Sequence, residues 1–257
     1  MSSKEEKFDM IANTHSSVSS NLSHRDYHIR NNSNDDSTKI GFDIPIDTDL
    51  AKISSIFQSQ HHVYNSEVKI GFQHYVIKGS NSQVSPVNAL INPGEMCLVM
   101  ADDSSTTSTF LKSINGEYET SNQFENVILK KYNLIYNDEV DVHFPHLTVD
   151  QTIQFAIDCK FNVDTETKNQ IKYTLINMFG LSHCLNTIVG NDYIRGISGG
   201  ERKRISIIES LIANGLVYLW DNSTKGLDSS TALEFIESLK KMTTLNHVTH
   251  LIGINQV

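Results

Sequence analysis

Residues 198–201 read Ser-Gly-Gly-Glu and have the residue types and spacing of an anion-binding turn. An amphipathic pattern follows at once, so we expect Ser198 to cap a helix, with Glu201 as its capping-box partner. The glycines let another group approach the backbone closely, and free N–H groups at the positive end of a helix attract anions. Further positive charge comes from three basic residues, Arg202, Lys203 and Arg204. Taken alone, the motif fits an anion site and a well-capped helix without a ligand equally well.

A carboxylate and a tight loop further along the chain favour the anion site. The apolar run 216–220 has the pattern of a buried strand and ends in Asp221. A carboxylate at the tip of such a strand can orient Mg²⁺ through water. Residues 226–228 then form a tight loop before the next helical pattern. These features favour a ligand-binding turn over a plain helix cap.

These motifs resemble those of ATP-binding cassette (ABC) proteins. The segments similar to the family's signature motif, Walker B strand and D-loop are residues 197–201, 217–222 and 226–228. The strings that resemble subfamily G, and the first cassette of its fungal pleiotropic drug resistance transporters, are residues 141–149, 196–206 and 220–229. The strings most similar to the sterol-uptake members are residues 189–192 and 206–209. The resemblance extends through most of the chain that we expect to be ordered.

The phosphate-binding loop (Walker A) has lost its chemistry in this sequence. A working loop reads GxxxxGK[ST], in which the glycines wrap the phosphates, the lysine neutralises them and the hydroxyl binds Mg²⁺. The resemblance places this loop on Ala101, Asp102, Asp103, Ser104, Ser105, Thr106, Thr107, Ser108 and Thr109. Both glycine positions are substituted, and Thr107 replaces the lysine; only Ser108 keeps its expected type. The two aspartates fall where phosphates would lie, and a like-charge contact at about 4 Å costs about 4 kcal/mol at an effective dielectric constant of about 20.

The resemblance places other catalytic positions on unsuitable residues. Asn222 stands at the catalytic carboxylate and cannot accept a proton at neutral pH. Glu139 stands at the Q-loop glutamine, Asn255 at the switch histidine and Asp228 in the D-loop. Ser108 and Asp221 remain as weak Mg²⁺ ligands. We therefore expect the isolated chain to hydrolyse no ATP.

The losses are one-sided, because the signature is intact. In the family two cassettes pack head to tail, and each ATP site joins the phosphate loop of one with the signature of the other. The resemblance thus implies that ATP and Mg²⁺, held mainly by a second cassette, are contacted by Ser198, Gly199, Gly200 and Glu201. We expect this to drive transmembrane transport of a sterol or a drug. The expected partners are the second cassette and transmembrane domains, at the cytoplasmic side of a membrane, whereas the chain alone would be cytoplasmic.

The elements around these motifs predict an α/β fold. Strands alternate with helices, which is typical of a mostly parallel sheet, here the P-loop NTPase-like ABC cassette. Two consecutive helical patterns interrupt the alternation and predict an inserted helical subdomain at about residues 148–195. The expected strands are residues 68–72, 75–77, 96–100, 134–136, 216–220 and 248–254. The expected helices are residues 107–114, a segment after Thr148, residues 165–179, a segment from Ser198 and residues 229–242.

Composition divides the 257 residues into a tail and a folded part. Residues 1–40 are rich in Ser, Asn, Asp and His and are predicted to form a disordered tail, because they bury too little apolar surface. Residues 41–67 form a lead-in of uncertain structure. The cassette is expected to occupy residues 68–257, and it stops directly after the switch position, so we expect a C-terminally incomplete cassette.

Several classes of function are disfavoured. The chain has 30 Asp and Glu against 21 Lys and Arg, the opposite of a nucleic-acid-binding balance. It contains no apolar run long enough to span a bilayer and no secretory signal. The three cysteines form no CxxC pair, and the spacing of the eleven histidines predicts no zinc site.

Three interpretations stay open from the sequence. The first is the transporter cassette described above. The second is a soluble regulatory or interaction protein that uses the cassette fold without transport. The third is an inactive, truncated remnant, which the altered phosphate loop and the abrupt end of the chain favour.

Overall fold

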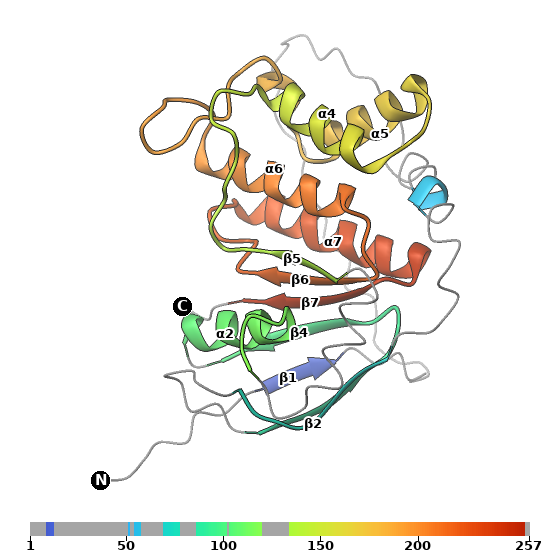
Figure 1. Ribbon diagram of the computed structural model, residues 1–257, viewed down its shortest axis with the longest axis vertical. Helices are drawn as coiled ribbons and strands as arrows, with labels where there is room; N and C mark the ends of the chain where they lie inside the picture. Colours follow the sequence, from blue (N-terminus) through green and yellow to red (C-terminus); the bar gives the residue numbers. More distant parts are fainter. Residues whose placement is uncertain are drawn as a thin grey trace, which may run out of the picture.

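The computed structural model describes residues 9–12, 51, 54–57, 69–77, 86–101, 103–119 and 134–254. Its main sheet has the strand order β1-β4-β7-β6-β5, and β2 and β3 form a separate antiparallel pair (Figure 1). The strands are β1 (Asp9–Ala12), β2 (Ile70–Tyr75), β3 (Val87–Ile91), β4 (Met96–Met100), β5 (Leu134–Asn137), β6 (Val217–Asp221) and β7 (Thr249–Gly253). The helices are α2 (Ser104–Ile114), α4 (Val149–Lys160), α5 (Thr165–Met178), the 3-10 helix η1 (Ser182–Cys184), α6 (Gly199–Ile212) and α7 (Ser229–Asn246).

The central part of the main sheet is parallel. Strands β4, β7, β6 and β5 pair in parallel, and β1 joins the β4 edge in the antiparallel direction. Parallel strands that are covered on both faces have continuous apolar sequences, as β4 and β6 do. Their carboxyl ends meet at one edge, so the loop before α2 and the end of β6 are brought together there.

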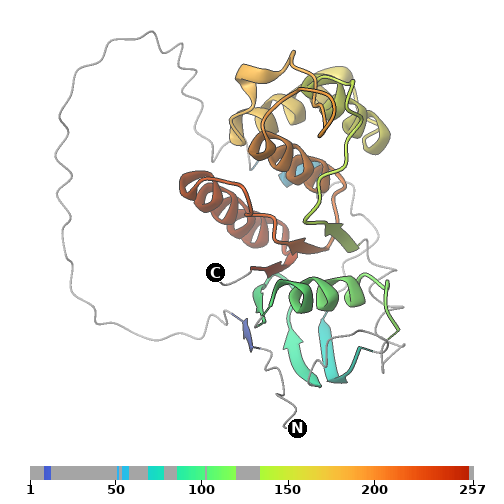
Figure 2. The same ribbon diagram turned by 90° about the vertical axis from the view of Figure 1, so that its left-hand side faces the viewer.

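Two hydrophobic clusters lie on opposite faces of this sheet. Because side chains alternate along a strand, Val217 and Leu219 of β6 pack with α2 and the β2–β3 pair. Tyr218 and Trp220 of the same strand point the other way, into the cluster formed with α6 and α7. In Figure 2, α2 and the β2–β3 pair lie below the parallel strands, and α6 and α7 lie above them.

A helical region covers α6 on its outer side, in the part of the chain predicted as a subdomain. Helices α4 and α5 pack together, and α4 contacts α6 (Figure 1). The capping box expected before α4 is present: the Thr148 side chain accepts from Gln151 N–H at 3.2 Å, and the Gln151 side chain accepts from Thr148 N–H at 3.0 Å. The subdomain boundaries remain a prediction.

The predicted α/β fold class is confirmed, and the differences from the sequence are local. Strand β1 lies within the predicted disordered tail, so that prediction is wrong for residues 9–12. Strand β3 was not predicted, and α2 begins earlier than residue 107 because Asp103 caps it. The lead-in supplies Phe57, which is buried and stacks on Phe161 at a centroid distance of 5.5 Å. The rest of the predicted tail, Asp102 and Asn255 lie outside the described residues.

Candidate functional site

The turn at residues 198–201 has the predicted capping geometry. Ser198 is the N-cap of α6, and its Oγ accepts from Glu201 N–H at 3.3 Å. The Glu201 carboxylate accepts from Ser198 N–H at 2.7 Å, which closes the capping box. Ser198 and Gly199 are exposed, and a Cβ added to Gly199 would meet nothing within 4 Å. The backbone at the positive end of α6 is therefore open to a ligand or a partner.

The loop before this turn is fixed by close backbone contacts. A Cβ added to Gly196 would lie 2.4 Å from the carbonyl oxygen of Val189, so only glycine fits there without a shift. The next residue, Ile197, donates its N–H to Ile188 O at 3.1 Å. These contacts fold the loop back on itself, and they hold Ser198 at the start of α6.

The signature turn and the predicted D-loop lie side by side. A Cβ added to Gly200 would be 3.0 Å from the carbonyl oxygen of Gly226. Asp228 caps α7 by accepting from Thr231 N–H at 3.1 Å, and it is exposed. Two exposed helix starts, those of α6 and α7, are thus presented together.

The start of α2, where the degenerate phosphate loop was predicted, is closed by its own chain. The Asp103 carboxylate accepts from Thr106 N–H at 2.8 Å, from Thr106 Oγ1 at 2.7 Å and from Ser105 Oγ at 2.5 Å. The hydrogen bond from Ser105, which has the largest effect, and those from Thr106 hold the pKa of Asp103 below its usual value. A fixed negative charge therefore occupies the helix start, which is the position where an anion would otherwise bind.

Thr107, at the predicted lysine position, packs into the core. Its side chain is buried, and within the described part of the chain its Oγ1 has no hydrogen-bond partner. It packs on β7, where a Cβ added to Gly253 would lie 2.7 Å from Thr107 Cγ2. The short residues Thr107 and Gly253 let α2 lie close to β7. Because position 107 is a threonine, it brings no cation to the start of α2.

Ser108 and Asp221, the predicted magnesium ligands, are brought together by the sheet edge. Ser108 Oγ donates to Asp221 Oδ1 at 2.8 Å, and Tyr136 Oη donates to Asp221 Oδ2 at 2.7 Å. Asp221 is fully buried, and burial raises its pKa while these two hydrogen bonds lower it. The sequence did not point to Tyr136, because nothing in its local pattern shows a partner that lies 85 residues away.

Asn222 and Glu139, at the predicted catalytic and Q-loop positions, contact each other. Asn222 Nδ2 donates to Glu139 Oε2 at 3.1 Å, so the amide serves as a donor in this contact. Lys225 pairs with the same carboxylate, and its hydrogen bond is the main reason that the pKa of Glu139 is lowered. The Asn222 amide cannot accept a proton at neutral pH, and the lowered pKa makes the Glu139 carboxylate a weaker base.

The predicted magnesium ligands and the start of α2 differ in how well they fit Mg-ATP. Ser108 and Asp221 supply the hard oxygen atoms that Mg²⁺ prefers, although both carboxylate oxygens of Asp221 already accept hydrogen bonds. The start of α2 does not fit a triphosphate, because Asp103 fills it with negative charge and position 107 is a threonine instead of a lysine. Among the described residues, the start of α6 is the better anion site.

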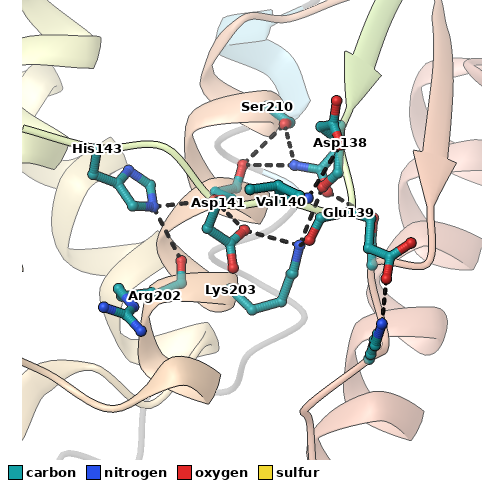
Figure 3. Close-up of polar contacts among 12 residues, drawn as sticks. Asp138, Glu139, Val140, Asp141, His143, Arg202, Lys203 and Ser210 are labelled. Atoms are coloured by element: carbon teal, nitrogen blue, oxygen red, sulfur yellow. Dashed lines mark hydrogen bonds and ion pairs between the residues drawn. The ribbon is translucent and has the colours of Figure 1, made fainter. Parts of the chain in front are cut away.

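A network of polar contacts joins the segment that contains Glu139 to α6. Lys203 Nζ donates to the carbonyl oxygens of Asp138 at 3.1 Å and Glu139 at 2.9 Å, and it pairs with the Asp141 carboxylate at 2.8 Å (Figure 3). His143 Nε2 lies 3.3 Å from Arg202 O. Lys203 is buried, so the sequence prediction that it adds positive charge at the anion site is wrong.

Asp103→Ala is expected to lower the free energy of unfolding by about 1 kcal/mol, the usual cost of losing an N-cap side chain. Asp103→Asn is the matched control, since an amide oxygen caps a helix about as well as a carboxylate. The folded-state pKa of Asp103 is depressed, so the stabilisation is complete above the ordinary pKa and is lost as pH falls through the folded value. Urea denaturation at several pH values measures both effects. Equal stability of the alanine and asparagine variants would show that Asp103 is not a cap.

The helices of the described ranges do not include a membrane span. Each of them is too short or too polar to cross a bilayer.

Comparisons with known proteins identify relatives of this chain. The family model described as ABC transporter matches residues 84–225. ATP-dependent permease AUS1 of Saccharomyces cerevisiae is 49% identical over 185 residues, which cover 68% of this chain and 13% of the relative. ATP-dependent permease PDR11 of the same yeast is 46% identical over 184 residues, with the same coverage of 68% and 13%. Protein SNQ2, also from this yeast, is 44% identical over 193 residues, which cover 67% of this chain and 13% of the relative.

The relatives are much longer than this chain, which spans about 13% of the length of those three proteins. The family model covers more than half of the chain, from residue 84, ahead of β3, to the loop after β6. The chain therefore belongs to the ABC transporter family, among its fungal pleiotropic drug resistance members.

Proposed function

We propose that this chain is a nucleotide-binding domain that lends its signature turn, residues 198–201, to ATP held by a second cassette. In this proposal its own phosphate loop holds no nucleotide, and ATP hydrolysis takes place at the paired site. The chain would thereby support transmembrane transport by a larger protein. Members of the family bind ATP with Mg²⁺ in general, and the proposal concerns which cassette holds it.

The contrast between two helix starts carries this proposal. The start of α2 is closed by the Asp103 carboxylate, whose oxygens already accept three hydrogen bonds. The start of α6 is capped by the neutral Ser198 hydroxyl, the Glu201 carboxylate of its first turn is bound back to Ser198, and Gly199 leaves its backbone open. The positive end of a helix stabilises an anion by about 0.3–1 kcal/mol at an exposed site. A triphosphate from outside is thus favoured at α6 and opposed at α2.

Exposed apolar side chains near the network support a protein partner. Val140, Val142 and Phe144 are 69%, 84% and 65% exposed, and they follow the segment that Lys203 holds against α6. Apolar side chains gathered at a surface mark contact sites more often than chance. We assign this contact to the transmembrane domains of the larger protein, as the family resemblance implies.

The cargo is proposed from similarity alone. Residues 189–192 and 206–209 are most similar to sterol-uptake members, which favours a sterol. ABC multidrug transporter atrI of Aspergillus fumigatus is also similar, 40% identical over 199 residues, so a drug is the second candidate.

The isolated 257-residue chain is expected to bind Mg-ATP with a dissociation constant weaker than about 1 mM, which corresponds to about 4 kcal/mol of binding free energy. The physical reason is the negative charge of Asp103 together with the loss of the lysine at position 107. Isothermal titration calorimetry with Mg-ATP measures it. The control is Asp221→Ala, which removes a predicted magnesium ligand. Micromolar binding that disappears in Asp221→Ala would overturn the proposal.

A further inference from the structure

Three metal-ligating side chains meet beside the signature turn. The 3-10 helix η1 supplies His183 and Cys184, and the first turn of α6 supplies Glu201. His183 Nε2 lies 2.7 Å from Glu201 Oε1, and these two atoms and Cys184 Sγ all lie within 4.8 Å of one another. A nitrogen, a sulfur and an oxygen ligand are thus already gathered at one place.

This set of atoms is the one that Zn²⁺ and similar borderline-soft divalent ions select. Zinc takes thiolate, imidazole and carboxylate ligands at roughly 2.3, 2.0 and 2.1 Å, and a site with three protein ligands keeps a fourth position for water. Tetrahedral geometry then puts neighbouring ligand atoms roughly 3.4 Å apart. His183 and Glu201, now in hydrogen-bond contact, would have to separate by less than 1 Å, roughly, to admit an ion.

The surroundings of the cluster allow an ion to enter and to be held. His183 is exposed, with 63% of its side chain accessible, so solvent reaches the cluster from its side. Glu201 contacts Ser198 through Oε2 and His183 through Oε1. Oε1 can therefore give up its hydrogen bond with His183 and bind an ion while the capping box stays closed. Second-sphere contacts of this kind orient a ligand and strengthen binding.

Cys184 is the ligand that changes most on binding. Its side chain is buried, and burial raises the pKa of the thiol, which contacts Leu181 O at 3.3 Å. An ion would displace the thiol proton to solvent and bind the thiolate, as metal sites in proteins do. The negative charge of Glu201 also raises the pKa of this thiol, and the positive charge of Arg204 lowers it.

We propose that His183, Cys184 and Glu201 form a binding site for Zn²⁺ or a similar divalent ion. The ion ties η1 to the first turn of α6 and so fixes the turn at residues 198–201. The spacing of cysteine and histidine pairs could not indicate this site, because the third ligand is a carboxylate 18 residues after His183. The proposal does not depend on ATP binding by this chain or by a partner.

Cobalt titration of the full 257-residue chain tests this proposal. Co²⁺ replaces zinc in such sites, and a thiolate ligand gives a near-ultraviolet charge-transfer band that histidines and carboxylates alone do not give. We expect this band together with the visible bands of a tetrahedral ion. Cys184→Ser should remove the charge-transfer band, and His183→Ala should weaken cobalt binding by about tenfold or more. Zn²⁺ should displace the cobalt and raise the melting temperature of the unmodified chain, because it binds the folded state.

Two exposed residues provide matched controls. Cys159→Ser removes an exposed thiol, and His146→Ala removes an exposed imidazole outside the cluster. Both control variants should keep the charge-transfer band and the cobalt affinity. Circular dichroism shows whether each variant is folded. If Cys184→Ser does not fold, His183→Ala still tests the site, because it changes only an exposed side chain. A band that persists in folded Cys184→Ser, or an affinity unchanged in His183→Ala, would overturn the site.

Discussion

Ser198→Arg is expected to abolish ATP hydrolysis and transport in a full-length protein that carries this cassette. The variant places a long side chain at an exposed helix start, where a partner's triphosphate is proposed to lie, and it removes the capping hydroxyl. Loss of one donor that faces developing charge in an active site costs on the order of 10²–10³ in rate. A loss of at least about a hundredfold in ATPase rate is therefore expected. The measurement is ATP turnover of the purified full-length protein in lipid.

The control for this prediction is Thr148→Arg. Thr148 caps α4 through the same kind of capping box, and it lies at the start of another helix. Both variants should lose about 1 kcal/mol of unfolding free energy, the usual cost of a lost cap. Only Ser198→Arg should lose turnover. Normal turnover in folded Ser198→Arg would show that the signature turn contacts no nucleotide.

The elements with strong local signals could be predicted from the sequence. Helix α5 was expected at residues 165–179 and is found at Thr165–Met178, because an apolar stripe marks it and Gly180 ends it. Strand β6 was expected from a continuous apolar run and is buried along its whole length. The capping box of α6 was visible as a serine and a glutamate three residues apart.

The remaining features depend on contacts between distant segments. Strand β1 has little apolar pattern, and its pairing with β4 joins residues about ninety positions apart, so no local signal marks it. The sequence placed Lys203 at the anion site, because it stands between two arginines and a basic run reads as one charged face. The helix turns Lys203 inward, toward a segment that begins 65 residues earlier. Tyr136 was missed for the same reason, since its Asp221 partner becomes its neighbour only when β5 and β6 pair.

Lys203→Met is expected to lower the free energy of unfolding by about 3 kcal/mol, because removal of one member of a buried ion pair leaves the other without compensation. The Lys203 side chain is 4% exposed, and its ammonium group contacts the Asp141 carboxylate and two backbone carbonyls. Methionine fills a similar volume but donates no hydrogen bond. Asp141 keeps its hydrogen bond from Ser206 at 2.7 Å, which holds the cost at the lower end of the usual range.

Lys112→Met is the matched control, because Lys112 pairs with the Asp138 carboxylate at 3.7 Å with side chains 30% and 44% exposed. A surface pair of this kind contributes about 1 kcal/mol or less. Urea denaturation of the two variants should therefore separate them by about 2 kcal/mol. In the double variant Lys203→Met with Asp141→Asn, the loss should be smaller than the sum of the single losses, because each change removes the same pair. Equal stability of the two lysine variants, or strict additivity with Asp141→Asn, would contradict the network. The segment that contains Glu139 would then be held against the signature helix by apolar packing alone.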